Sequence, residues 1–273
     1  MRQTILVAFI LAAPLNVAAG AGYDDLNVAI SYFDQEQYDN AISWFDKAIA
    51  ANDLTPDLMR LAYLDRGLSH SAKSETQKAI ADYGSAIATK PNDMLAYRER
   101  ISAYLASADL EKALTDYESL RRLRPHDYDI LMNIGWLNWQ LNHIEASADA
   151  FFYFAQVDPY CWLWLQLANV RQGKPMTEYT EDAEARKWPG HLPRFYRGHL
   201  SESDVLEAAK SIKGRNALCF GYAFTAMWRV VHNDQTGATP LLQSATEQCA
   251  KGSPYWNIVR AELNKVTSGD GAK

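Results

Sequence analysis

The 273-residue sequence lacks the spacings that mark most metal and catalytic sites. Six histidines are present, but none stands in an H-x-x-x-H or H-E-x-x-H arrangement, which would place two imidazoles on one helix face for zinc. There is no G-x-S-x-G nucleophile motif, no phosphate-binding P-loop and no C-x-x-C pair. We therefore predict no metal, no cofactor and no enzymatic activity.

Positive charge is also in short supply. Lys and Arg number 27 against 33 Asp and Glu, which gives a formal net charge of −6. Nucleic acids and anionic membranes are bound through a clustered basic face. The densest basic run, Arg121, Arg122 and Arg124, falls at the expected end of a helix, where the helix dipole favours cations. The sequence therefore argues against a nucleic-acid partner.

The first 21 residues form a separate apolar segment. Arg2 precedes an apolar stretch over residues 5–13, Pro14 interrupts it, and small residues follow at 19–21. The stretch is shorter than the ~20 apolar residues that span a bilayer. We predict a signal peptide over 1–21, cleaved near Ala19–Ala21, with membrane contact only during export to the periplasm. An uncleaved anchor is the alternative, and no cysteine lies at the cleavage site for lipid attachment.

No part of the sequence alternates between apolar and polar residues with a period of two, so no β-sheet is expected. A repeat of 34 residues is present instead. Ala79, Tyr83, Ala86 and Pro91 recur 34 residues later as Ala113, Tyr117, Leu120 and Pro125. Gly135, Ser147, Phe151 and Pro159 continue the step, and Ala29, Ala41, Phe45 and Ala48 fit it upstream after a four-residue insertion.

This period and these residue types resemble the tetratricopeptide repeat. The resemblance implies an all-α, right-handed solenoid of antiparallel helix pairs, in which small residues allow close helix approach and large ones fill the space between repeats. Four repeats are expected, over 22–55, 60–93, 94–127 and 128–161. The family's usual tryptophan is replaced by Asp25, Tyr63, Tyr97 and Leu131.

After Pro159 the repeat register is lost. We expect a non-repeat helical segment over 162–215, with one helix near 177–187 and another capped at Ser201–Asp204. A degenerate fifth repeat and a capping helix are expected over 216–267, and a disordered tail over 268–273. The order of residues 163–173, 188–190 and 197–209 resembles exported bacterial adaptor proteins with these repeats, which bring peptidoglycan hydrolases to a processing protease.

The three cysteines fall into a pair and a single residue. Cys219 and Cys249 stand at positions 1 and 31 of the degenerate fifth repeat, which are neighbouring places in a helical hairpin. We predict a structural disulfide between them. Cys161 is left over, either as a buried thiol or as an intermolecular bridge.

The first helix of each repeat is expected to line a concave groove, and aromatic and arginine residues favour a protein-binding surface. The predicted anchors are Phe33, Leu64, Asp65, Arg98, Glu99, Met132, Trp136 and Trp139. The alternative is that segment 175–215 folds back over this face. The predicted function is a non-catalytic periplasmic adaptor that binds a protein or peptide, such as an envelope hydrolase or protease. The other candidate is a cell-wall accessory protein that binds muropeptides or glycans; the oligomeric state stays open.

Overall fold

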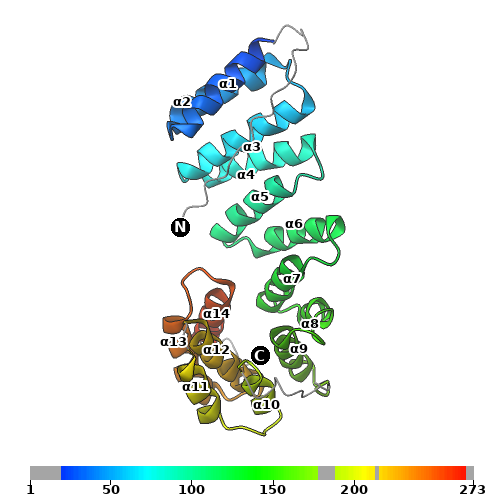
Figure 1. Ribbon diagram of the computed structural model, residues 1–273, viewed down its shortest axis with the longest axis vertical. Coiled ribbons are helices and arrows are strands. Elements are labelled where there is room, and N and C mark those ends of the chain that lie inside the picture. Colours follow the sequence, from blue (N-terminus) through cyan, green and yellow to red (C-terminus); the bar gives the residue numbers. More distant parts are fainter. Residues whose placement is uncertain (1–19, 178–187, 213–214, 269–273) are drawn as a thin grey trace. The chain divides into compact units, whose positions relative to one another are not determined.

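A computed structural model describes residues 20–177, 188–212 and 215–268 (Figure 1). All regular structure within these ranges is helical, which confirms the predicted all-α class. Three pairs of consecutive helices pack together: α1 (Ala21–Asp34) with α2 (Tyr38–Ala51), α3 (Pro56–Ala72) with α4 (Thr76–Thr89), and α7 (Tyr128–Gln140) with α8 (Ile144–Phe152). Helices α5 (Met94–Ala106) and α6 (Leu110–Leu123) follow α4 in the chain. None of the described helices combines the length and hydropathy that crossing a membrane requires.

Six further helices follow: α9 (Pro159–Arg171), α10 (His191–Tyr196), α11 (Glu202–Ser211), α12 (Arg215–Val231), α13 (Gln235–Gln248) and α14 (Pro254–Ser268). The helix predicted near 177–187 and the tail after residue 268 lie outside the described residues. The chain divides into an N-terminal unit that ends at Ala103 and a C-terminal unit that begins at Tyr104.

Small residues bring the paired helices of the repeats together. A Cβ atom on Gly67 of α3 would lie 2.7 Å from a ring carbon of Tyr83 on α4, and one on Gly135 of α7 would lie 2.5 Å from the Phe151 ring on α8. Both rings are buried. The absence of a side chain at these two glycines therefore sets how closely the helices pack.

The turns that follow α1, α3, α5 and α7 share one backbone conformation. The second residue after the end of each of these helices takes a positive φ: 58° at Glu36, 61° at Ser74, 56° at Ala108 and 63° at Asn142. Among these, asparagine tolerates the left-handed region best. The geometry of the helix pair thus imposes this conformation whatever residue is present.

Helix α9 organises the C-terminal unit. Its residues 161–169 are all buried, which fits a helix whose sequence is apolar on every side. Asp158 caps it by accepting a hydrogen bond of 2.8 Å from the backbone N–H of Cys161. The rings of Trp164, Phe151 and Phe224 pack together in the core that surrounds it.

The last helices of the C-terminal unit pack as a group, which Figure 1 shows. Cys219 on α12 and Cys249 at the end of α13 form the predicted disulfide. Cys161 is a buried free thiol. Ser201 and Asp204 form the expected capping box at the start of α11.

Candidate functional site

Two carboxylates of the N-terminal unit stand at the same position in consecutive repeats. Asp65 on α3 lies two residues before Gly67, which contacts Tyr83 on α4. Glu99 on α5 lies 34 residues later, two residues before the buried Ile101. Helical residues two apart project on nearly opposite sides, so both carboxylates lie on the side of the helix away from the close-packed position. We call Asp65, Glu99 and the residues beside them the acidic face.

Asp65 is a half-buried carboxylate without a donor. Among the described residues, no group donates a hydrogen bond to its side chain, although its backbone oxygen accepts one of 2.8 Å from the hydroxyl of Ser69. Burial raises the pKa of Asp65 to about 7; the nearby charge of Asp34 adds to the rise and Arg60 opposes it. Desolvation without hydrogen bonds disfavours the charged form.

Glu99 has the same character. Its side chain is half-buried, burial raises its pKa, and none of the described residues donates to it. It also lies near enough to Tyr83 to add to the rise in the pKa of that phenol, which burial causes in the first place. The equivalent positions of two consecutive repeats therefore each carry a half-buried acid to which none of the described residues donates a hydrogen bond.

The cations near these acids do not neutralise them. Arg60 Nη1 lies 2.9 Å from Asp93 Oδ2 and is therefore already engaged. Arg98 is exposed on α5, beside Glu99 in sequence. Phe33 on α1 is half-buried and supplies apolar surface. The acidic face consequently carries two carboxylates that none of the described cations pairs with directly.

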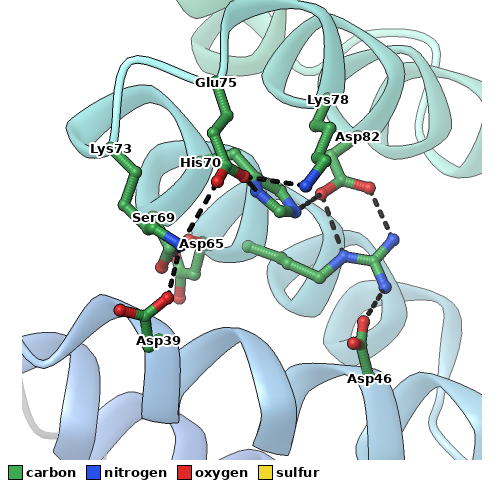
Figure 2. A network of polar contacts seen from close by, with 10 residues as sticks. Asp39, Asp46, Asp65, Ser69, His70, Lys73, Glu75, Lys78 and Asp82 are labelled. Carbon is green, nitrogen blue, oxygen red and sulfur yellow. Dashed lines mark hydrogen bonds and ion pairs between the residues drawn. The ribbon is translucent and has the colours of Figure 1, made fainter.

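A second polar cluster in the same unit has a different character (Figure 2). Arg66 of α3 binds Asp82 of α4 through two parallel bonds, Nε to Oδ2 at 2.9 Å and Nη2 to Oδ1 at 2.5 Å, and its third nitrogen lies 2.5 Å from Asp46 of α2. Bidentate pairing with a guanidinium satisfies both oxygens of the carboxylate. These bonds connect α3 to α4 and to α2.

Glu75 extends this cluster (Figure 2). It accepts a hydrogen bond of 3.1 Å from Lys78, lies 2.7 Å from Nδ1 of His70 and 3.2 Å from Lys73. These contacts, with Lys78 and then His70 contributing most, lower the pKa of Glu75 to about 2. Four acids of the cluster have cationic partners, so we assign them to stability: Asp39, Asp46, Glu75 and Asp82. Asp65 is drawn in Figure 2 as well, where it joins the network through its backbone oxygen and Ser69. The contrast with Asp65 is what singles out the acidic face.

The remaining predicted anchors are packed inside their units. Leu64 is 2% exposed and belongs to the core between α3 and α4. In the C-terminal unit, Met132 is 3% and Trp139 0% exposed, while Trp136 is half-buried with its ring 5.4 Å from that of Tyr255 on α14. The expectation that Leu64, Met132 and Trp139 line an open groove is therefore corrected.

Helix α14 packs over the face of α7 that carries Trp136 and Trp139. Trp139 donates its indole N–H to Glu262 of α14, and Trp136 contacts Tyr255 of the same helix. The alternative considered from the sequence placed segment 175–215 over this face instead. The tryptophan side chains of α7 bury their apolar surface only when another helix packs on them, and α14 is that helix.

The comparison with known families decides the nature of the helix pairs. The family model of the tetratricopeptide repeat matches residues 26–94 and 98–156. These two stretches carry tetratricopeptide repeats. No curated protein matches the chain.

Two solved structures share this repeat fold. One is a tetratricopeptide repeat protein from Parabacteroides merdae, with a TM-score of 0.50 and 17% identity over 91% of this chain and 100% of that one. The other is the C-terminal part of a tetratricopeptide repeat protein from Cytophaga hutchinsonii, with a TM-score of 0.50 and 15% identity over 94% of this chain and 89% of that one. At such identities the likeness describes the fold alone.

Tetratricopeptide repeats commonly act as protein-binding scaffolds and are typically not catalytic. Within the described residues, no three His, Cys, Asp or Glu side chains gather as a metal site would require. Sequence reasoning named Asp65 and Glu99 among eight anchors but favoured the aromatic residues of the fourth repeat, Trp136 and Trp139. The spacing of 34 residues between Asp65 and Glu99 was the signal that could have set these two acids apart.

Proposed function

We propose that this protein is a non-catalytic scaffold whose acidic face, around Asp65 and Glu99, holds a partner segment that carries Lys or Arg. The pair of half-buried carboxylates without donors carries this proposal. A desolvated, unpaired charge destabilises a folded protein, and a cation from a partner would offset that cost. Perturbed acids that no structural contact explains are candidates for binding residues.

Arg98 is exposed and stands next to Glu99 in the sequence. Arg98 favours an acidic or amide group in a segment whose cation binds Asp65 or Glu99. Charge complementarity of this kind selects partners and speeds association. The proposed partner is therefore a protein or peptide segment of mixed but predominantly basic character.

We further propose that the protein works in the periplasm. Residues 1–21 have the pattern of a signal peptide, of which 1–19 lie outside the described residues, and α1 begins at Ala21. The disulfide between Cys219 and Cys249 suits an oxidising compartment. The proposed partners in that compartment are envelope proteins, including hydrolases or proteases of the cell wall. A role in glycan binding has less support, because Trp139 is not available for stacking on a sugar ring.

A titration with defined peptides tests the binding face. The purified protein is titrated calorimetrically with a Lys-rich peptide and with a Glu-rich peptide of equal length and equal apolar content. We expect binding of the Lys-rich peptide alone, and a loss of affinity of about tenfold or more in the double variant Asp65→Asn, Glu99→Gln. The matched control is Glu111→Gln, Glu145→Gln, which removes two exposed acids of the C-terminal unit.

The pH dependence of the same titration sharpens the test. Because the pKa of Asp65 is about 7, its carboxylate gains charge between pH 6 and pH 8, and affinity for the Lys-rich peptide should rise over this interval. The Asp65→Asn variant should lose most of that rise. Equal binding of both peptides, or equal affinity in the double variant and its control, would contradict the proposal.

A further inference from the structure

The C-terminal unit contains a polar cavity of about 470 Å³ that no part of the proposed function uses. It lies where α7, α9 and α12 end, and α14 passes along it. Its polar lining consists of Gln140, Asn142, Arg171, Asn233, Gln235, Glu262 and Lys265. Pockets for small molecules in proteins have volumes of about 300–1,000 Å³ and carry a few convergent polar groups.

Glu262 is the buried charge of this cavity. It is 3% exposed and still reaches the cavity lining. Its Oε1 accepts a hydrogen bond from Trp139 Nε1 at 3.2 Å and lies 3.2 Å from Lys265 Nζ. Both contacts end on the same oxygen, so Oε2 is the oxygen left to a ligand. A buried carboxylate is expensive unless its lone pairs find donors.

Two cations stand beside this acid. Lys265 contacts it directly, and Arg171 lies over the Trp139 ring, with Cζ 5.1 Å from the ring centroid. One Nη of Arg171 donates to Asn142 Oδ1 at 2.9 Å, which orients the guanidinium at the cavity. Arg171 itself is exposed, so some of its guanidinium N–H groups can donate to a bound carboxylate.

Helix ends complete the balance of charge. The C-terminal ends of α7, α9 and α12 meet here, and each helix end carries roughly half a negative charge. Together with Glu262 they carry slightly more negative charge than Arg171 and Lys265 carry positive, and the N-terminal end of α13 at Gln235 adds roughly half a positive charge. The cavity therefore offers both signs of charge in close proximity without a large excess of either, and this arrangement suits a ligand that also carries both signs.

We propose that this cavity binds a small zwitterion of amino-acid chemistry, with its ammonium on Glu262 and its carboxylate on Arg171 and Lys265. The amide side chains of Gln140 and Asn233 provide donors and acceptors for a peptide group between the two charges. A free amino acid and a short peptide share this chemistry. The site is separate from the acidic face and independent of it.

Isothermal titration with four compounds tests the proposal. L-alanine and L-alanyl-L-alanine carry both charges; N-acetyl-L-alanyl-L-alanine lacks the ammonium and L-alanyl-L-alaninamide lacks the carboxylate. We expect at least one zwitterion to bind at millimolar concentration or below, and each blocked compound to bind about tenfold weaker or worse. The zwitterion that binds more tightly shows whether the site prefers a free amino acid or a short peptide. Absence of heat with both, or equal binding of a blocked form, overturns the proposal.

Two variants assign the site. Glu262→Gln keeps an acceptor for Trp139 but loses the charge. Arg171→Gln changes an exposed residue, so it remains a valid test even if Glu262→Gln folds poorly. Each should weaken zwitterion binding about tenfold or more. The matched controls are Glu207→Gln and Arg260→Gln, an exposed acid and another arginine that lies over a tryptophan ring. Unchanged binding in both site variants overturns the assignment, whereas Asp65→Asn should leave zwitterion binding intact.

Discussion

The indole Nε1 of Trp139 donates a hydrogen bond of 3.2 Å to Oε1 of Glu262, a residue 123 positions further along the chain. Both side chains are buried, and the bond fixes α14 on α7. Glu262→Ala leaves the indole N–H unsatisfied and opens a void, so we expect a loss of about 2–4 kcal/mol in the free energy of unfolding. Glu262→Gln retains the acceptor and should cost clearly less. Urea denaturation followed by near-ultraviolet circular dichroism measures both, and equal losses would exclude this role for the bond.

Ala108 tests whether repeat geometry imposes the left-handed turn. Its φ is 56°, a conformation that a non-glycine residue adopts at a cost of ~1 kcal/mol. Ala108→Gly should therefore raise the stability by about 0.5 kcal/mol, the relief of strain exceeding the added entropy of the unfolded chain. The control is Ala106→Gly, the same change in the last turn of α5, which should lower stability by about 0.5–1 kcal/mol. A loss at both positions would mean that the turn is unstrained.

The fold could be predicted from the sequence because its determinants are local. The 34-residue step places Gly67 against Tyr83 and Gly135 against Phe151, and each contact spans only 16 residues. The capping box at Ser201 is encoded within four residues. Repeat structures bury their apolar faces against sequence neighbours, so a periodic sequence specifies most of the packing.

The site could be predicted only in part. The repeat register predicts that Asp65 and Glu99 occupy equivalent positions. Whether their carboxylates are desolvated depends on neighbouring side chains that the sequence pattern does not specify. Trp139 has the sequence position of a groove residue, and its burial depends on α14, which returns to α7 after more than a hundred residues. A contact of that separation leaves no periodic signal, because it occurs once in the chain.

The bidentate pair of Arg66 and Asp82 should dominate the polar cluster of the N-terminal unit. The side chain of Asp82 is 7% exposed, so Asp82→Ala would leave the guanidinium partly buried without its main partner. We expect a loss of roughly 2–4 kcal/mol in the free energy of unfolding. Asp39→Ala, which removes an exposed partner of Lys73 in the same cluster, should change stability little. Comparable losses in the two variants would show that the cluster acts as one unit.

The disulfide should hold the hairpin of α12 and α13. The bond closes a loop with a sequence separation of 30, for which chain entropy gives about 3–4 kcal/mol. The variant Cys219→Ser, Cys249→Ser should unfold at a correspondingly lower urea concentration, while Cys161→Ser tests the buried thiol alone. Thiol titration of the unfolded protein should find one reactive thiol without reductant and three with it. Three thiols in both conditions would exclude the bond.

Asp65 should make the protein less stable as the pH rises. Its pKa is about 7 in the folded state against the model-compound value of 3.8, so between these values the folded protein keeps a proton that the unfolded chain has released. Stability then falls with rising pH by up to about 1.4 kcal/mol per pH unit over this window. Asp65→Asn removes that dependence and should be more stable than the parent protein at pH 8 by roughly 2–4 kcal/mol, with little difference near pH 4.

Urea denaturation at pH 5, 6, 7 and 8 measures this difference, and Asp39→Asn serves as the control, because Asp39 is exposed and paired with Lys73. Parallel curves for the parent protein and Asp65→Asn would show that Asp65 is not held in a desolvated state. Addition of the Lys-rich peptide at pH 8 should stabilise the parent protein more than the variant, since a bound cation supplies the partner that the fold withholds. The same carboxylate thus connects a cost in stability with the proposed function.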